Sequence, residues 1–446
     1  MIVMKFGGSS LESAVAIQRV VGIVADRLAQ KPVVVVSAMG KTTNKLLAIA
    51  NEAAAGNRRK ALELLSELRA YHLQEAGPLA VVDSLFDELE ELVKGISVMQ
   101  ELTPRSIDAV SSYGERLSSA ILTLAFQSKG IAAVNVDARR VIVTDKRHTQ
   151  AAPLLQQSYT RLAAVIPQEA EKQVVVMGGF IAATEEGITS TLGRGGSDFS
   201  ASIVGAGIGA DEIQIWTDVD GMLTADPTIL PGGHRVKAIS FAEAAELAYF
   251  GAKVLHPATV MPAIEKNIPV LILNSRRPEA GGTRIVKETV KCSNMAKSIA
   301  CKKNITLMNI LSSRMFMAHG FLRRIFEVFD RYETAVDMVA TSEVSVSLTI
   351  DNTAKLAEIR ADLEKFSEVS VEENQVIVCL VGDNIRYTPG VASRAFQALE
   401  KINIRMISQG ASLLNLSVVV AQEDLREAVQ QLHTEFFSEL DPGVFD

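Results

Sequence analysis

The first half of the chain alternates short apolar runs with longer amphipathic stretches, and this alternation constrains the fold more than any other feature. Strand-like runs, several of them apolar on both faces, occur at residues 2–6, 33–37, 131–136, 174–177, 213–217 and 270–273. Helical spacing fills residues 10–28, 42–55, 106–128, 158–170, 197–206 and 241–249. Strands that are buried on both faces are typical of a parallel sheet covered by helices. The pattern therefore predicts a doubly wound, mainly parallel α/β domain whose ligands bind beyond the carboxyl ends of the strands.

The length and charge of the chain exclude several classes of protein. A chain of 446 residues is too long for one core, so more than one domain is expected. The 45 basic and 52 acidic residues give a net charge of −7, which argues against a nucleic-acid partner. No apolar run reaches membrane-spanning length, and the first strand begins at Ile2, without a preceding signal segment. Three scattered cysteines fit neither a zinc site nor a disulfide framework, so we expect a cytoplasmic protein.

Two further regions depart from the alternation. Residues 58–75 and 81–100 have the spacing of two amphipathic helices, which form a helical insertion over 57–103. This insertion is either a lid or a packing layer, and the packing layer is favoured. Past residue 283, segments 320–350 and 390–420 share one order of glycine, helix, short strand, turn and alternating strand, offset by about 70 residues. This repeat predicts two α+β modules of the βαββαβ type and indicates a regulatory region.

The segment Thr191-Leu-Gly-Arg-Gly-Gly-Ser-Asp198 brings a cation, a carboxylate and flexible backbone together where a strand is expected to meet a helix. The planar fork of Arg194 matches a carboxylate or a phosphate, and Asp198 can hold an ammonium group or a metal ion. Free N–H groups at a helix start favour anions. The loop suits a zwitterion or a nucleotide; the alternative is a glycine-rich turn whose charged side chains are merely solvated.

The segment Lys5-Phe-Gly-Gly-Ser-Ser10 closes the first strand with an ammonium group beside two glycines. This arrangement predicts an anion cradle, although a plain turn with a solvent-reaching lysine is the alternative. The spacing is neither that of a Walker A loop nor Gly-x-Gly-x-x-Gly, which weakens a dinucleotide-binding interpretation.

Other polar side chains are expected near the same sheet edge. Residues 37–44 supply hydroxyl groups, with Thr42 and Thr43 also candidates for helix N-caps. Glu115 lies beside a glycine in a helical stretch, where it either accepts a substrate ammonium group or faces solvent. His256 precedes a proline and is interpreted as structural.

A turn rich in carboxylates, with Asp218, Asp220 and Asp226, follows the strand that ends near Thr217. These side chains either face a metal or hold lysines such as Lys253, and the spacing does not match an EF-hand. Two lysines near 4 Å would each contribute about 4 kcal/mol of Coulomb energy at an effective dielectric constant of 20. Together with the lack of a convincing Ser-His-Asp set, this favours phosphoryl transfer, in which positive charge matters more than a base.

These motifs, in this order, resemble those of the aspartate kinases within the amino-acid kinase family. The matching segments are residues 5–9, 111–115, 192–198, 216–218, 241–246 and 250–257, and the tail resembles paired ACT modules. The resemblance implies transfer of the γ-phosphoryl group of ATP to the β-carboxylate of L-aspartate, giving 4-phospho-L-aspartate. It also implies Mg²⁺ held mainly by the nucleotide phosphates. The alternatives are a kinase for a glutamate-type carboxylate, a non-catalytic amino-acid sensor and a nicotinamide dehydrogenase.

The resemblance also implies a set of roles. Lys5, Lys253 and Asp218 would be catalytic. The residues implied to hold aspartate are Thr43, Glu115, Arg194, Ser197 and Asp198. Those implied to line the ATP site are Lys5, Gly7, Gly8, Ser9, Thr217, Asp218, Asp226 and Lys253. Lysine-sensitive bacterial relatives carry a tyrosine before Thr224, whereas this chain has Leu223, which is therefore left out of the site.

The tail is most similar to the lysine-sensitive branch, which implies feedback inhibition by lysine at an interface between ACT modules of a dimer or tetramer. The implied effector residues are Met315, Phe321, Leu322, Val336, Asp337, Ser342 and Glu343. Asp337 and Glu343 are expected near the inhibitor's ammonium groups, the alternative being a turn cap and a solvated side chain. The expected domains are a kinase domain over 1–290 and ACT modules over 312–375 and 376–446, with part of 295–311 open to assignment to the second module.

Overall fold

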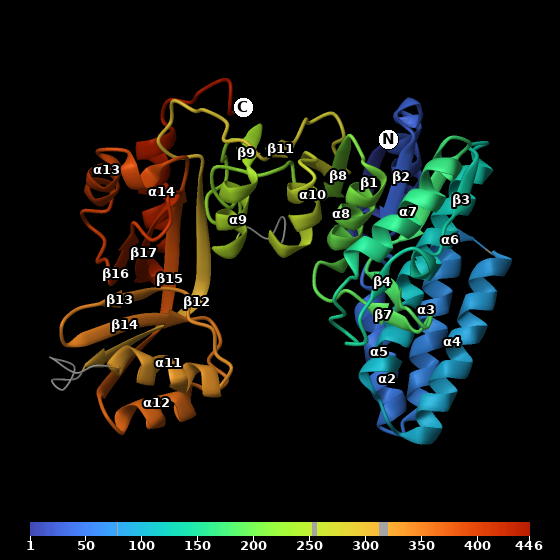
Figure 1. The fold of residues 1–446 in the computed structure, drawn as a ribbon, viewed down its shortest axis with the longest axis horizontal. Coiled ribbons are helices and arrows are strands. Elements are labelled where there is room, and N and C mark those ends of the chain that lie inside the picture. Colours follow the sequence, from blue (N-terminus) through green and yellow to red (C-terminus); the bar gives the residue numbers. More distant parts are fainter. Residues whose placement is uncertain (78, 252–256, 312–319) are drawn as a thin grey trace. The chain divides into compact units, whose positions relative to one another are not determined.

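A computed structural model describes residues 1–77, 79–251, 257–311 and 320–446 (Figure 1). The chain forms two compact units, one of Met1–Gly221 with Val254–Glu288 and the other of Met222–Lys253 with Thr289–Asp446. Among the described residues, no helix combines the length and the apolar character needed to cross a membrane. The predicted division at residue 290 stays a prediction about functional domains, because Met222–Lys253 packs with the second unit.

A mainly parallel sheet is the centre of the first unit. Its strands run in the order β3 (Ala133–Asn135), β5 (Val174–Gly178), β2 (Pro32–Val36), β1 (Ile2–Phe6), β8 (Glu212–Thr217), β10 (Val270–Asn274) and β11 (Thr283–Val286). All neighbouring pairs from β3 to β10 are parallel, and only β11 is antiparallel to β10. The predicted mainly parallel α/β fold is confirmed. Its central strands β1 and β2 are buried, except for the partly exposed Lys5, and their carboxyl ends lie at one edge.

Helices cover this sheet as the periodicity predicts. They are α1 (Ala14–Ala25), α2 (Thr42–Ala54), α5 (Pro104–Ser111), α6 (Tyr113–Ser128), α7 (Leu155–Ala170), α8 (Gly196–Ile208) and α10 (Met261–Glu265). The single helix expected over 106–128 is two helices, α5 and α6. A small second sheet of β4 (Val143–Thr144), β6 (Ile181–Thr184) and β7 (Thr189–Thr191) lies outside the predicted set.

The predicted helical insertion forms α3 (Arg58–Ala76) and α4 (Ala80–Met99). Their apolar faces belong to the same core as the sheet: Leu68 and Leu89 are fully buried together with Met4 and Trp216 of the strands. The C-terminal part of α3 also reaches the loop after β1, where the hydroxyl of Tyr71 donates to the carbonyl of Glu12 at 2.7 Å. The insertion is therefore a packing layer of the first unit (Figure 1).

The second unit contains β9 (Ala238–Ser240), α9 (Phe241–Tyr249) and a sheet with the order β13-β14-β12-β15-β17-β16. Its strands are β12 (Ser298–Leu311), β13 (Val339–Thr341), β14 (Ser345–Ile350), β15 (Glu368–Val381), β16 (Met406–Gln409) and β17 (Asn415–Ala421). The helices α11 (Phe321–Arg331), α12 (Leu356–Glu364), α13 (Val391–Ala398) and α14 (Leu425–Phe437) complete it.

Two long central strands are shared by both halves of this sheet. The C-terminal part of β12 pairs with β14 and with the start of β15, whereas the N-terminal part of β12 pairs with the end of β15, which in turn pairs with β17. The first half thus runs in the predicted βαββαβ order, and the second half follows that order from β15 to α14. The second half takes its outer strand from residues 298–302, which precede the first half in the sequence.

Candidate active site

Three backbone hydrogen bonds bring the loops after β1, β2 and β8 to one edge of the sheet. The N–H of Gly7 donates to the carbonyl of Trp216 at 3.2 Å, and the N–H of Gly40 donates to the carbonyl of Gly8 at 2.9 Å. The loop after β10 joins them, because the N–H of Ser275 donates to Thr217 at 2.8 Å. The predicted convergence of motifs at the carboxyl ends of the strands is therefore present for these loops.

Gly8 has no room for a side chain. A Cβ atom there would lie 2.8 Å from the carbonyl oxygens of both Ala38 and Gly40. The backbone of the loop is consequently pressed against its neighbour, a close approach that requires glycine. The N–H of Gly7 is engaged by Trp216, so it is not free to bind an anion in this conformation.

Lys5 and Asp198 form an ion pair of 2.7 Å within this edge. Their side chains are only 11% and 17% exposed, so both are largely withdrawn from water. Asp198 lies in the first turn of α8, where the helix dipole favours a carboxylate. The sequence placed these two groups in separate motifs, and the structure joins them.

Arg194 is held on a loop that adopts left-handed backbone at Gly193 and Gly195, with φ of 73° and 71°. Its side chain is exposed. The base of this loop is fixed by the buried carboxylate of Asp108, which accepts the hydroxyl proton of Thr191 at 2.6 Å. Asp108 also accepts the N–H of Thr149 at 3.0 Å. The sequence reading missed Asp108, because nothing local connects it with a segment 83 residues away.

Glu115 is buried at the start of α6, so the solvent-facing alternative is wrong. One carboxylate oxygen accepts the N–H of Ala38 at 3.1 Å. The other is buried and has no hydrogen-bond partner among the described residues. Burial raises the pKa of Glu115 to about 8, against the opposing effect of the bond from Ala38. A buried carboxylate with a free oxygen is suited to receive an ammonium group.

Some of the remaining candidates in the first unit have their side chains engaged in the fold, whereas others are partly or fully exposed. Thr42 is fully buried, and its hydroxyl donates to the carbonyl of Met39 at 2.6 Å, which leaves Thr43 as the partly exposed neighbour. Asp218 is exposed and accepts the hydroxyl of Thr217 at 3.2 Å. Ser9 and Ser197 are partly buried. Asp220 is engaged by the amide of Asn274 at 2.7 Å and by Arg277.

Some predicted residues are not part of this edge as described. Asp226 belongs to the second unit, is exposed and accepts the N–H of Thr228 at 2.8 Å. Lys253, His256 and Met315 lie outside the described residues. Within the described ranges, no three His, Cys, Asp or Glu side chains are grouped so as to hold a metal ion.

In the second unit, Asp337 is the central predicted effector residue. Its side chain is 3% exposed and forms a 2.6 Å ion pair with Lys302, while the hydroxyl of Tyr249 donates to the same oxygen at 3.3 Å. Burial raises the pKa of Asp337, although the bond from Lys302 opposes this. Ser342 bonds to Ser345 at 2.7 Å, and Glu343 is exposed. Of the other predicted effector residues, Phe321 is buried, Val336 half-buried and Leu322 exposed.

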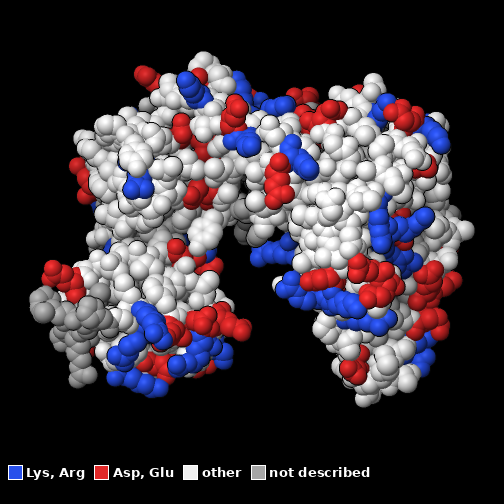
Figure 2. Space-filling view, in the orientation of Figure 1, with Lys and Arg blue, Asp and Glu red and all other residues white. Residues whose placement is uncertain are grey.

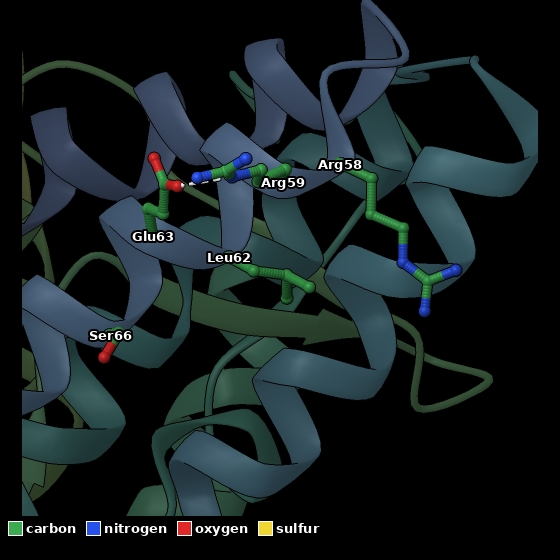
Figure 3. A pocket seen from close by; sticks show the side chains of 5 residues that line it. All are labelled: Arg58, Arg59, Leu62, Glu63 and Ser66. Carbon is green, nitrogen blue, oxygen red and sulfur yellow. Dashed lines mark hydrogen bonds and ion pairs between the residues drawn. The ribbon is translucent and has the colours of Figure 1, made fainter.

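Two surface features lie apart from the candidate site. An open hollow at the start of α3 is lined by Arg58, Arg59, Leu62, Glu63 and Ser66, with Arg59 and Glu63 paired at 2.9 Å (Figure 3). The described acidic and basic side chains are interspersed on the face displayed in Figure 2.

Comparison with known proteins places the chain in a family. A model of the amino acid kinase family matches residues 1–274, and a model of an ACT domain matches residues 378–436. The chain is 39% identical to the chloroplastic aspartokinase 1 of Arabidopsis thaliana, over 98% of the chain and 80% of that protein. It is 35% identical to the lysine-sensitive aspartokinase 3 of Escherichia coli, over 98% of the chain and 99% of that protein.

Solved structures agree with this placement. Escherichia coli aspartokinase III in complex with aspartate and ADP superposes with a TM-score of 0.82 at 34% identity, covering 98% of this chain and all of that one. Clostridium acetobutylicum aspartate kinase gives a TM-score of 0.86 at 28% identity, with 98% and 100% coverage. The chain therefore belongs to the amino acid kinase family and, within it, to the aspartokinases.

Proposed function

We propose that this chain transfers the γ-phosphoryl group of ATP to the β-carboxylate of L-aspartate and releases 4-phospho-L-aspartate, the first step of the pathway to lysine, threonine and methionine. The observation that carries the proposal is the sheet edge where the Lys5–Asp198 ion pair, the crowded Gly8 loop and the buried Glu115 meet. The Escherichia coli relative that binds aspartate and ADP supports the choice of ligands.

Each group has a chemical task in this proposal. The ammonium group of Lys5 neutralises the phosphoryl group while it is transferred, with the N–H of Gly8 and the hydroxyl of Ser9 as further donors. Gly7 contributes close backbone approach, since its N–H is bonded to Trp216. The guanidinium of Arg194 binds the α-carboxylate of aspartate, and Glu115 accepts its ammonium group. Thr43, Ser197 and Asp198 complete the aspartate site. The acceptor carboxylate is ionised at neutral pH, so no general base is required.

The nucleotide completes the proposed site. Thr217, Asp218 and Asp226 are proposed to contact ATP, and Lys253 is proposed as a second catalytic cation. Mg²⁺ is proposed to bind chiefly to the ATP phosphates, since the carboxylates of Asp218 and Asp226 are exposed and isolated and suit at most a few coordination positions. Bound there, the ion would neutralise phosphate charge.

Regulation by an amino acid is proposed for the second unit. The Escherichia coli relative is lysine-sensitive by name, and its structure with lysine and aspartate superposes on this chain with a TM-score of 0.83 at 35% identity. We expect lysine to bind near Asp337 in a dimer or larger assembly formed through the ACT modules and to favour an inactive state. Activity that is unchanged across millimolar-scale lysine, threonine and methionine would remove this part of the proposal.

The catalytic proposal is tested by replacing Lys5. Acyl phosphate formed from aspartate and ATP is trapped with hydroxylamine, in parallel with glutamate and N-acetylglutamate as acceptors. We expect Lys5→Ala to lower kcat by about a hundredfold to a thousandfold, because one electrostatic donor at a transferring group contributes about 3–4 kcal/mol. Replacement of the exposed Lys41 by alanine serves as a matched control and should leave turnover intact. Undiminished turnover in Lys5→Ala would refute the assignment, and activity only with N-acetylglutamate would refute the substrate.

A further inference from the structure

The carboxylate of Asp337 has hydrogen-bond partners on only one of its two oxygens. One oxygen receives both Lys302 and Tyr249, whereas the other is buried and has no hydrogen-bond partner among the described residues. A side chain that is 97% withdrawn from water and retains a free oxygen is costly to the fold unless a partner arrives. An ammonium group is the partner that this oxygen fits.

The chain itself already places one ammonium group on the other oxygen of this carboxylate. The Nζ atom of Lys302, on β12, lies 2.6 Å from Asp337 and 2.8 Å from Asp351, and 5.3 Å from the centroid of the Tyr249 ring. The resulting cation–π contact and two ion pairs hold Lys302 in place. Asp351 is 44% exposed, so Lys302 retains a partner there when it leaves Asp337.

The same strand also contacts the end of α9. Gly251 adopts φ of 113°, and a Cβ atom there would lie 2.3 Å from the carbonyl oxygen of Cys301, the residue before Lys302. Tyr249, the last residue of α9, bonds to Asp337. The position of Lys302 is thus coupled by direct contacts to the end of α9, and any ligand that displaces it acts on that helix.

We propose that Lys302 is a built-in competitor for the amino-acid effector: its ammonium group occupies Asp337 when the effector is absent, and the effector's ammonium group takes its place. This inference rests on the regulation proposed above. Lys302 then sets the effector concentration needed, because an effector ammonium group that bridges both oxygens of Asp337 requires the internal pair to open. If that pair is closed about 90% of the time, the apparent Kd is about tenfold higher than the intrinsic one.

The test measures L-lysine binding to the full-length protein by calorimetry, and inhibition in the hydroxamate assay. We expect Lys302→Met, which keeps the length of the side chain but removes its charge, to lower the Kd and the half-inhibitory concentration about tenfold. Lys302→Arg should stay within about threefold of the wild type. Lys303→Met is the matched control, since Lys303 is the exposed neighbour, and should leave both quantities unchanged.

A higher Kd for L-lysine in Lys302→Met than in the wild type would overturn the inference. If Lys302 instead builds the effector site, Lys302→Met weakens binding, as Asp337→Asn is expected to do in either case. Equal affinities in Lys302→Met and Lys303→Met, or no binding of lysine, threonine or methionine to the wild type, would also overturn it. Failure of the proposed function is separate, because it appears as absent phosphorylation of aspartate in the wild type.

Discussion

At the scale of single residues, Glu115 connects burial with substrate binding. Its pKa of about 8 means that the folded protein without ligand holds a proton on this side chain at neutral pH, whereas the unfolded chain releases it near pH 4.5. Between these values the folded state binds more protons, so this group makes the folded state less stable as the pH rises toward 8. A bound ammonium group stabilises the ionised carboxylate, so it lowers the pKa of Glu115 and favours loss of the proton.

This gives a pH prediction for aspartate binding. Below pH 8, binding of L-aspartate should release a proton from Glu115, and the affinity should rise with pH by up to about tenfold per unit. Calorimetry at pH 7 in two buffers with different ionisation enthalpies checks this, because the observed enthalpy must differ between them. Glu115→Gln, which has no proton to release, should bind weakly and show no buffer dependence. A buffer-independent enthalpy in the wild type would contradict the role of Glu115.

The sequence was sufficient to pick out Lys5 and Asp198 as candidate site residues, but not to predict that they form an ion pair with each other. Lys5 and Asp198 stood out because each sits in a glycine-rich motif where a strand meets a helix. Their pairing depends on β1 and α8 meeting in space, which no local pattern encodes. No sequence pattern identified Asp108, because an aspartate in an amphipathic helix is normally expected to face solvent. Its burial is evident only from the structure, in which Thr149 and Thr191 donate hydrogen bonds to it.

At the scale of elements, apolar runs and helical spacing located the six main strands of the parallel sheet, because strands buried on both faces are continuous in apolar residues. The same signal failed for β4, β6 and β7, which are two to four residues long and too short to carry a period. The helical pair α3 and α4 was recognised from its amphipathic pattern, but only the shared core identifies it as a packing layer.

That packing layer makes a stability prediction. Leu68→Ala should lower the free energy of unfolding of the first unit by about 2–5 kcal/mol, because Leu68 is fully buried in the common core. Leu62→Ala on the same helix should cost clearly less, since Leu62 is only half-buried. Urea unfolding followed by tryptophan fluorescence measures both, with the single Trp216 as the probe. Equal, small effects would mean that α3 moves as a separate element.

At the scale of the whole molecule, β12 and β15 make the two halves of the regulatory sheet one cooperative body. A cavity in the first half, produced by Ile325→Ala, should cost about 2–5 kcal/mol, because Ile325 is completely buried. Hydrogen exchange of the full-length protein should then show reduced protection in β17 as well as in β14, since both pair with the shared strands. Loss of protection confined to β14 would indicate independent halves.

The order of strands along β12 also has a consequence for synthesis. Residues 298–302 leave the ribosome well before residues 377–381 of β15, the segment beside which they come to lie. At ordinary translation speeds, roughly ten seconds separate the first from the last of these segments. This outer strand of the second module therefore remains unpaired with β15 until residues 377–381 have been synthesised. A polypeptide cut short before β15 leaves both modules incomplete, because each module needs part of that one strand.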